Sequence, residues 1–230
     1  MAAYARAKGV ALRPHAKTHK SADIAKRQLA AGAVGICCAK LGEAEALAGG
    51  TVESILLTSP IVSSAGIARY VELNARVRDL AVVVDNPDNV TALARALGPD
   101  TTQLLIDVDP GIRRTGVASP DAAVQLLAAI QRHPNLQYRG VQFYCGLQQH
   151  IAAFAERRDA IAERTRYLEQ VIELLTRCGG APGVVSGSGT GTHRIDAELG
   201  VITEWQVGSY VFMDGQYGAC QLAEQWAPFE

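Results

Sequence analysis

The chain has 230 residues, a formal net charge of −1 and 48% hydrophobic residues, which is typical of a globular protein with a sizeable core. This charge balance argues against nucleic-acid binding, because proteins that track phosphates are usually strongly basic. No apolar run approaches the ~20 residues of a membrane helix, and the N-terminus lacks the apolar segment of a signal peptide. The five cysteines contain no Cys-x-x-Cys pair, so we expect reduced thiols in a cytoplasmic protein.

Short β-branched runs alternate with helical patterns along the chain. We expect strands at residues 10–15, 34–39, 54–58, 80–85, 103–109, 139–144, 184–188 and 203–210, and helices at 21–31, 42–48, 64–77, 87–97, 120–132, 154–178 and, briefly, 192–199. Asn86-Pro87 and Ser119-Pro120 have the residue types of a helix N-cap followed by a first-turn proline. The alternation predicts a (β/α)8 barrel of TIM type in one domain, residues 1–230, with an open doubly wound sheet as the alternative.

A basic stretch lies at the end of the first expected strand. Side chains alternate between the faces of a strand, so Arg13, His15 and Lys17 are expected on one face. Such a row is costly inside a protein unless an anion lies nearby, and an exposed edge strand is the alternative. Partial burial beside the cations Arg13 and Lys20 would lower the pKa of Lys17, which suits a lysine that forms a Schiff base.

Two glycine-rich segments follow the last two expected strands. Residues 186–192 read Ser-Gly-Ser-Gly-Thr-Gly-Thr, and residues 206–210 read Gln-Val-Gly-Ser-Tyr. Glycine lets backbone N–H groups converge on an anion, and TIM barrels often bind phosphate on the loops after strands seven and eight. Either segment alone is more often a flexible turn, but the two together predict a phosphate site.

Two further segments follow the fifth and sixth expected strands. Residues 107–116 contain adjacent Arg113 and Arg114, one of which could bind an anionic ring oxygen or a carboxylate; a solvated turn is the alternative. His150 is a candidate general base, with a surface or capping histidine as the alternative. A Schiff-base lysine, a phosphate site and an inward arginine together describe a site for pyridoxal 5′-phosphate (PLP).

Residues 13–20, Arg-Pro-His-Ala-Lys-Thr-His-Lys, resemble the lysine motif of the D-threonine aldolase / D-serine dehydratase family, PLP enzymes with the alanine-racemase-like barrel of fold type III. The resemblance continues through residues 109–116, 140–144, 186–192 and 208–214, in the family's order. It implies that Lys17 carries PLP. The other cofactor-binding residues that it implies are His15, Arg114 at the 3′-oxygen, Tyr144 lining the pocket, Gln206 facing the ring nitrogen, and Gly189, Thr190, Gly208 and Ser209 at the phosphate.

The resemblance also implies a reaction. His150 matches a histidine near the substrate hydroxyl, and the expected activity is a lyase that cleaves D-threonine to glycine and acetaldehyde. Gln206 stands where alanine racemases have an arginine, and we expect this uncharged partner to leave the ring nitrogen unprotonated. The alternatives are a D-serine dehydratase (ammonia-lyase), a non-catalytic PLP-binding barrel, and a barrel enzyme in which Lys17 forms an imine with a phosphorylated substrate.

The family's members extend beyond this chain at both ends. They begin with a strand of a C-terminal β-domain that carries a metal-binding pair, so we expect this chain to be truncated at both ends and to lack that domain. A divalent metal, Mn or Zn, is expected only of the full-length protein, and no metal ligand is assigned in this chain. The expected partners are a small D-amino acid substrate and a second copy in a homodimer.

Overall fold

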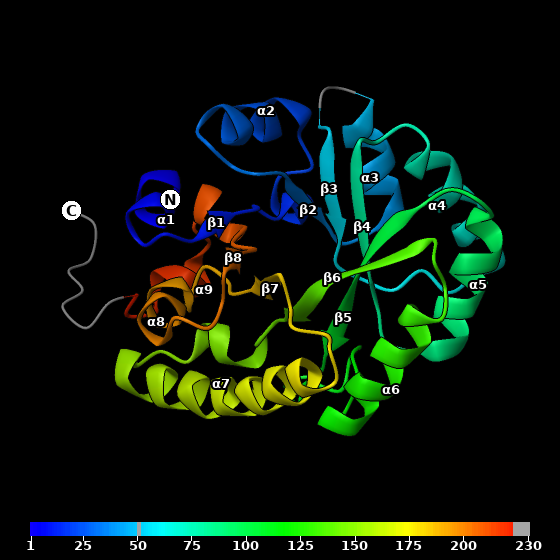
Figure 1. Cartoon of the computed structure of the whole chain (residues 1–230). Coiled ribbons are helices and arrows are strands. Elements are labelled where there is room, and N and C mark those ends of the chain that lie inside the picture. The colour runs from blue at the N-terminus through cyan, green and yellow to red at the C-terminus, as the bar shows by residue number, and fades with distance from the viewer. Residues whose placement is uncertain (50–51, 223–230) are drawn as a thin grey trace.

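Eight parallel strands form one sheet in the order β1-β8-β7-β6-β5-β4-β3-β2 (Figure 1). The computed structural model describes residues 1–49 and 52–222, so the predicted domain, 1–230, includes ten residues outside the described ranges. The strands are β1 (Ala11–Leu12), β2 (Ile36–Cys38), β3 (Ser54–Leu57), β4 (Asp79–Val84), β5 (Thr102–Val108), β6 (Leu136–Phe143), β7 (Val184–Gly187) and β8 (Glu204–Trp205).

The two ends of this sheet meet between β1 and β2. Val34 N donates a hydrogen bond to Leu12 O at 2.9 Å, and Cys37 N donates to Pro14 O at 2.8 Å. His15 and Cys37 form a further parallel bridge. The strands therefore close into a barrel, which confirms the predicted (β/α)8 fold and excludes the open doubly wound sheet.

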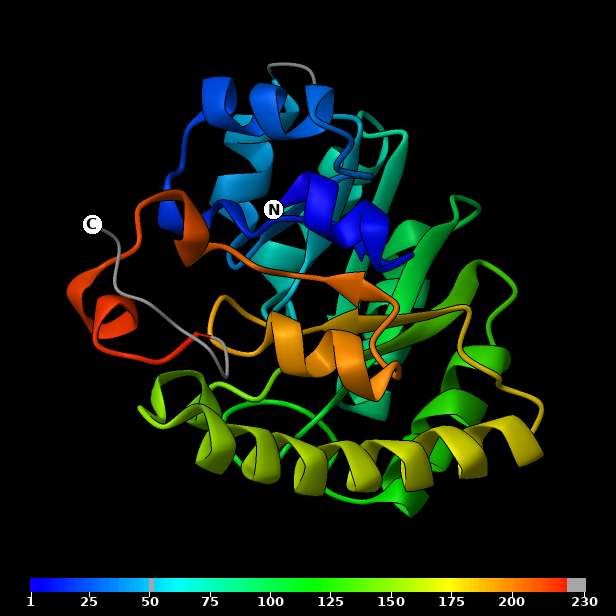
Figure 2. The same cartoon turned by 90° about the vertical axis from the view of Figure 1, so that its left-hand side faces the viewer.

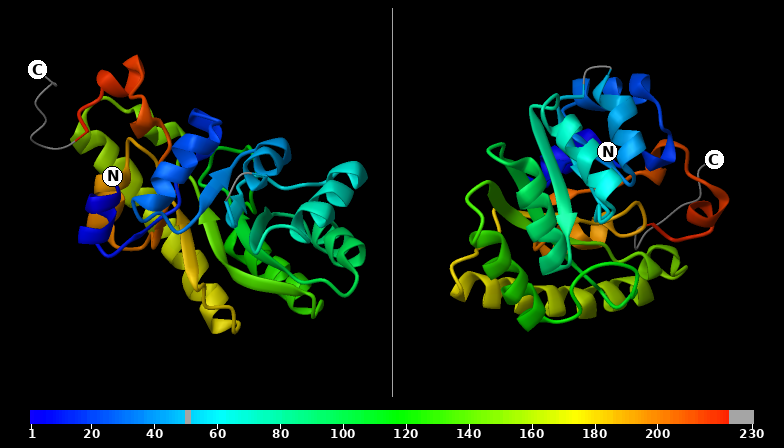
Figure 3. Two further views of the ribbon diagram at one scale, coloured as in Figure 1. Left: turned by 90° about the horizontal axis from the view of Figure 1, so that it is seen from above. Right: turned by 90° about the vertical axis from the view of Figure 1, so that its right-hand side faces the viewer.

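Helices cover the outside of the barrel, as the views from above and from the side show (Figure 3). They are α1 (Ala2–Ala7), α2 (Ala22–Ala30), α3 (Leu41–Ala48), α4 (Ser64–Asn74), α5 (Pro87–Leu97), α6 (Pro120–Gln131), α7 (Phe154–Arg177), α8 (His193–Leu199) and α9 (Gly215–Gly218). The 3-10 helices η1 (Ala16–Thr18), η2 (Leu147–His150) and η3 (Ser209–Val211) follow β1, β6 and β8. The predicted caps form, because Asn86 Oδ1 accepts from Asp88 N at 2.7 Å and Ser119 Oγ accepts from Ala122 N at 3.2 Å.

The first helix, α1, packs where the barrel's first and last strands adjoin (Figure 2). The Tyr4 ring stacks on Trp205 of β8 with ring centroids 5.7 Å apart. The same ring meets His193 of α8 edge-on, also with centroids 5.7 Å apart. Aromatic contacts of this kind add to the burial of the rings, so α1 is tied to the last strand of the barrel although it begins the chain.

Alternation along the strands produces two cores. On β5, Leu104, Ile106 and Val108 join the large outer core between strands and helices. Leu105, on the opposite face, joins a small cluster inside the barrel, whose other members are Cys37, Leu56, Ala81 and Val83. The remaining interior side chains are largely polar, which is unusual for a packed barrel and directs attention to what they bind.

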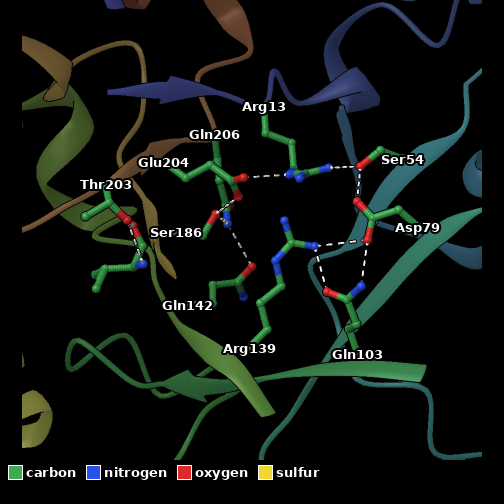
Figure 4. A network of polar contacts seen from close by, with 11 residues as sticks. Arg13, Ser54, Asp79, Gln103, Arg139, Gln142, Ser186, Thr203, Glu204 and Gln206 are labelled. Carbon is green, nitrogen blue, oxygen red and sulfur yellow. Dashed lines mark hydrogen bonds and ion pairs between the residues drawn. The ribbon is translucent and has the colours of Figure 1, made fainter. Parts of the chain in front are cut away.

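An ion pair inside the barrel joins its first and last strands (Figure 4). Arg13 Nε donates to Glu204 Oε2 at 2.9 Å, and the two side chains are only 2% and 5% exposed. Arg13 Nη1 also donates to Ser54 Oγ at 2.8 Å, and Ser54 Oγ donates to Asp79 Oδ2 at 2.5 Å. Burial alone would lower the pKa of Arg13, but the Glu204 carboxylate outweighs it and the pKa is raised.

The first strand is shorter than predicted. It ends at Leu12, and Lys17 lies on η1 rather than on a strand. Pro14 has no N–H to donate to a strand ladder, and the His15 side chain accepts from Lys17 N at 3.3 Å, which begins the helical turn. The prediction that Arg13, His15 and Lys17 share a strand face is therefore wrong: the first two are buried, and Lys17 is exposed.

Replacing Glu204 by glutamine should destabilise the barrel strongly, because it leaves the Arg13 charge buried without its partner. We expect the free energy of unfolding in urea to fall by roughly 3–5 kcal/mol. The matched control is Glu53→Gln, which removes an exposed pair with Arg78 (3.2 Å) and should cost at most about 1 kcal/mol. Equal losses in the two variants would contradict a structural role for the buried pair.

Candidate active site

The C-terminal ends of the strands bring the candidate residues to one mouth of the barrel. Lys17 follows β1, Arg114 follows β5 and Tyr144 follows β6. The two glycine-rich loops follow β7 and β8, where they carry Gly189 and Gly208. Because all strands are parallel, these segments share one rim, the position at which TIM-type barrels place their active sites.

Lys17 faces an aromatic ring and a second cation. Its Nζ lies 5.1 Å from the centroid of the Tyr144 ring, and the Arg114 Cζ lies 5.8 Å from the same centroid. Lys17 is exposed on the open side of the mouth, yet the pKa of its ammonium group is lowered, first by burial and then by repulsion from Arg114. The structure thus places near Lys17 the arginine that the resemblance implies.

The two cations that the sequence suggested as the cause of this shift have partners elsewhere. Arg13 is paired with Glu204 below the mouth, and Lys20 Nζ lies 4.0 Å from Glu43 Oε1. Neither cation contributes to the lowered pKa of Lys17. The prediction of a lowered pKa was correct in direction, but its cause is burial and Arg114.

His15 supports the backbone of Lys17 from below. Its Nδ1 accepts from Lys17 N, so Nε2 carries the ring hydrogen and donates to Thr58 Oγ1 at 3.0 Å, a tautomer assigned from the hydrogen-bond network. Thr58 Oγ1 in turn donates to Cys38 O at 3.2 Å. Burial, followed by the nearby charges of Lys17 and Arg114, lowers the pKa of His15 well below its usual value. The imidazole is therefore a neutral, fixed support.

The loops after β7 and β8 contact each other and the Lys17 turn. Tyr210 N donates to Thr190 Oγ1 at 3.0 Å, so the hydroxyl hydrogen of Thr190 can serve an anion. A Cβ on Gly208 would lie 2.9 Å from Thr18 Oγ1 and 3.0 Å from His15 O, closer than ordinary contacts allow. Glycine is required there because the β8 loop lies directly against the turn that carries Lys17.

Three buried side chains that the sequence analysis did not select hold the β7 loop. Gln149 Oε1 accepts from Gly191 N at 3.0 Å, and Gln149 Nε2 donates to Thr192 Oγ1 at 3.1 Å. Thr192 Oγ1 donates to Asp196 Oδ2 at 2.7 Å, and burial raises the pKa of Asp196 to about 6. A Cβ on Gly189 would lie 2.3 Å from Gln149 Oε1. Thr192 ends the glycine-rich segment 186–192 and Gln149 directly precedes His150, whereas Asp196 had no sequence signal.

His150 and Gln206 differ in their exposure to solvent at the mouth. His150 is exposed at the end of η2, with its ring centroid 4.5 Å from that of Tyr217. Burial and then the nearby Tyr144 raise the pKa of Tyr217. The Tyr217 ring therefore lies near both His150 and Tyr144. Gln206 is buried beneath the mouth.

The residues present fit PLP. An amine with a lowered pKa, an arginine and a tyrosine ring stand together, and two glycine loops meet beside them. Within residues 1–49 and 52–222, no group of three or more His, Cys, Asp or Glu side chains could hold a metal ion. In the same ranges, no helix is both long and apolar enough to cross a membrane.

Comparisons with known proteins agree with this geometry. The family model described as alanine racemase, N-terminal domain, matches residues 1–216. A D-threonine aldolase of Arthrobacter sp. is 41% identical over 95% of this chain and 58% of its own length. A 3-hydroxy-D-aspartate aldolase of Paracoccus denitrificans (strain Pd 1222) is 36% identical over 97% of this chain and 59% of its own length.

A solved structure shows the same arrangement of elements. The D-threonine aldolase from Filomicrobium marinum superimposes with a TM-score of 0.93 at 36% identity, over 96% of this chain and 60% of the other. The chain thus spans about three fifths of the length of the relatives that it matches. On its sequence and its fold, the chain belongs to the alanine racemase N-terminal domain family.

Proposed function

We propose that this chain binds PLP through Lys17 and provides the barrel of a lyase for D-3-hydroxy amino acids, of the D-threonine aldolase type. The observation that carries the proposal is the Lys17 amine, whose pKa is lowered and which lies at the parallel-strand mouth facing Tyr144 and Arg114. The names of the relatives support the reaction class, since both curated relatives are called aldolases of D-configured substrates.

The chain's own residues divide the binding work. Lys17 supplies the amine, whose lowered pKa favours the neutral form, and Arg114 would bind the anionic 3′-oxygen. Tyr144 would form one wall of the pocket, while His15 keeps the Lys17 turn in place from below. Thr190, Gly189, Gly208 and Ser209 would bind the phosphate from the β7 and β8 loops.

In the aldol cleavage, the substrate loses the proton of its β-hydroxyl while the bond between Cα and Cβ breaks. PLP, when bound, supplies an electron-withdrawing ring that stabilises negative charge on the α-carbon. His150 is the proposed base for the hydroxyl proton, and its exposed position at the mouth leaves it accessible to a substrate. The α-carbon must then take up a proton, so that D-threonine would give glycine and acetaldehyde. A divalent metal, Mn or Zn, would assist in the full-length protein.

The proposal extends to the cellular location and the binding partners of the protein. All five cysteines are free, and four of them are buried, which supports a reducing, cytoplasmic location. We also propose a homodimer that binds a small D-amino acid, with neither a membrane nor a nucleic acid as partner. The near-neutral charge supports the last point.

Binding of PLP should depend on Lys17 and not on its neighbour Lys20. On addition of PLP we expect a visible absorption band, because a lysine Schiff base conjugates with the ring. Lys17→Gln should abolish this band. Lys20→Gln, at a lysine that is 68% exposed, should keep it. A band that survives the Lys17 change would refute the proposed attachment.

The charge of Arg114 should set the pH at which Lys17 reacts. Repulsion from Arg114 disfavours the ammonium form, so the neutral amine forms at lower pH than in a free lysine. In Arg114→Gln the pKa of Lys17 should rise, and its labelling by acetic anhydride should shift to higher pH. Mass spectrometry of the Lys17 peptide measures this without cofactor. Arg113→Gln removes the adjacent arginine, which is equally exposed but does not contribute to the lowered pKa of Lys17, and should leave the labelling unchanged; equal shifts would contradict the assignment of Arg114.

Catalysis should depend on His150. With PLP and Mn²⁺ or Zn²⁺, we expect acetaldehyde and glycine from D-threonine, and a rate roughly 10²-fold lower in His150→Gln because general-base catalysis is lost. His133→Gln serves as the control, because His133 lies before the start of β6, at the opposite end of that strand from Tyr144. Formation of ammonia and a keto acid instead would assign a dehydratase, and PLP binding without turnover of D-threonine, D-serine or 3-hydroxy-D-aspartate would favour a PLP-binding barrel.

A further inference from the structure

The side chain of Gln206 lies beneath the candidate PLP site and is only 4% exposed. Its amide nitrogen donates two hydrogen bonds, to Gln142 Oε1 at 3.1 Å and to Ser186 Oγ at 3.0 Å. An amide has two hydrogens on nitrogen and an acceptor oxygen, and its two ends have nearly the same shape. The direction in which Gln206 presents this amide therefore has to be settled by its partners.

The first partner is itself fixed. Gln142 Nε2 donates to the backbone oxygen of Thr58 at 3.2 Å and to Asp107 Oδ1 at 2.9 Å. A backbone carbonyl can only accept, so the nitrogen of the Gln142 amide must face Thr58. The oxygen of Gln142 is consequently the atom that faces Gln206, and Gln206 has to donate to it.

The second partner gives the same answer independently. Ser186 Oγ donates its hydrogen to Glu204 Oε1 at 2.8 Å, and the other carboxylate oxygen of Glu204 accepts from Arg13 at 2.9 Å (Figure 4). A hydroxyl has one hydrogen, so Ser186 can only accept from Gln206. Turning the Gln206 amide over would place its oxygen against two acceptors.

Both amide hydrogens of Gln206 are thus committed, and its oxygen remains. Among the described residues, none donates a hydrogen bond to Gln206 Oε1. The protein does not cover this oxygen completely, so it borders open space. The barrel therefore presents a hydrogen-bond acceptor, held in one orientation, to which a molecule bound in the mouth can donate.

We propose that this donor is the protonated ring nitrogen of PLP, and that Gln206 stabilises the protonated ring by accepting its hydrogen bond. The inference rests on the proposed function. The phosphate and the 3′-oxygen are acceptors, which the glycine loops and Arg114 would bind, and Lys17 would take the carbonyl carbon. The ring nitrogen is the remaining polar atom. A hydrogen bond to the charged form favours that form.

This assignment reverses the expectation from residue type alone. Glutamine in place of the arginine of alanine racemases suggests an unprotonated ring nitrogen. That expectation holds only if the glutamine amide can donate an N–H group to the ring nitrogen. Here Gln142 and Ser186 occupy both N–H groups. Gln206 then acts on the cofactor in the opposite sense to an arginine, and the ring would be a stronger electron acceptor.

The test is the nitrogen-15 chemical shift of labelled PLP bound to the intact chain. We expect the ring resonance of the wild type at the position of a protonated pyridine. Gln206→Leu, which has no acceptor, should move it toward the position of the neutral ring. Gln206→Glu loses both donated hydrogen bonds to Gln142 and Ser186 but keeps an acceptor oxygen, now charged, so the protonated position should persist; this separates loss of the acceptor from loss of the hydrogen bonds that hold the amide. Gln137→Leu, at an exposed glutamine on β6, is the matched control and should not shift the resonance.

The outcomes separate the two proposals. A neutral-ring resonance in the wild type, or a protonated one that persists in Gln206→Leu, would overturn the role of Gln206 while leaving PLP binding intact. Failure of PLP to bind in a Lys17-dependent manner would overturn the proposed function and this inference together. Circular dichroism of each variant verifies that the barrel is folded before the spectra are compared.

Discussion

A buried ion pair between Arg13 and Glu204 connects the start of the barrel to its end, and much of the interior depends on it. Glu204 also accepts from Ser186, so the same carboxylate orients the polar groups beneath the mouth. Burying two charges is costly, and such a pair contributes little net stability compared with an apolar filling. Its value here is geometric, because it fixes the position of β8 against β1 and with it the two segments that carry Gln206 and Lys17.

Within the described part of the chain, the cations Lys17 and Arg114 at the mouth above this pair lack the carboxylate partner that the buried arginine below has. Below, Arg13 is matched by a carboxylate. Above, burial and then Arg114 disfavour the charge of Lys17, and Cys37 and Glu43 offset only part of the effect. Two nearby cations repel each other, and an anionic ligand relieves the repulsion. The arrangement lowers the cost of a neutral lysine and favours a ligand that carries phosphate.

The helices and most strands could be predicted from the sequence because their signals are local. Pro87 after Asn86 marks the start of α5 by the chemistry of one turn, and the predicted bounds 87–97 agree with the structure. The end of β1 was missed, since a basic alternating pattern outweighed Pro14 in the prediction. The family motif correctly placed Lys17 and Arg114 at one mouth, a contact that joins two distant segments and has no local signal.

The supports of the site were harder to find. Gln149 and Asp196 hold the β7 loop through hydrogen bonds between separate elements, and nothing in the residues beside Asp196 indicates this. The orientation of the Gln206 amide likewise depends on partners from β6 and β7. The family resemblance implied where Gln206 lies, but the sequence could not show which atom of its amide faces the ligand. The orientation of the amide reverses the expected effect of Gln206 on the ring nitrogen.

The central claim is that Lys17 is the residue that binds PLP. Reduction of the PLP-loaded protein with borohydride, followed by protease digestion and mass spectrometry, measures this directly. The account predicts a stable pyridoxyl group on the peptide that contains Lys17, at close to one per chain, with Lys20 unmodified. A label spread over exposed lysines, or concentrated on any lysine other than Lys17, would contradict it.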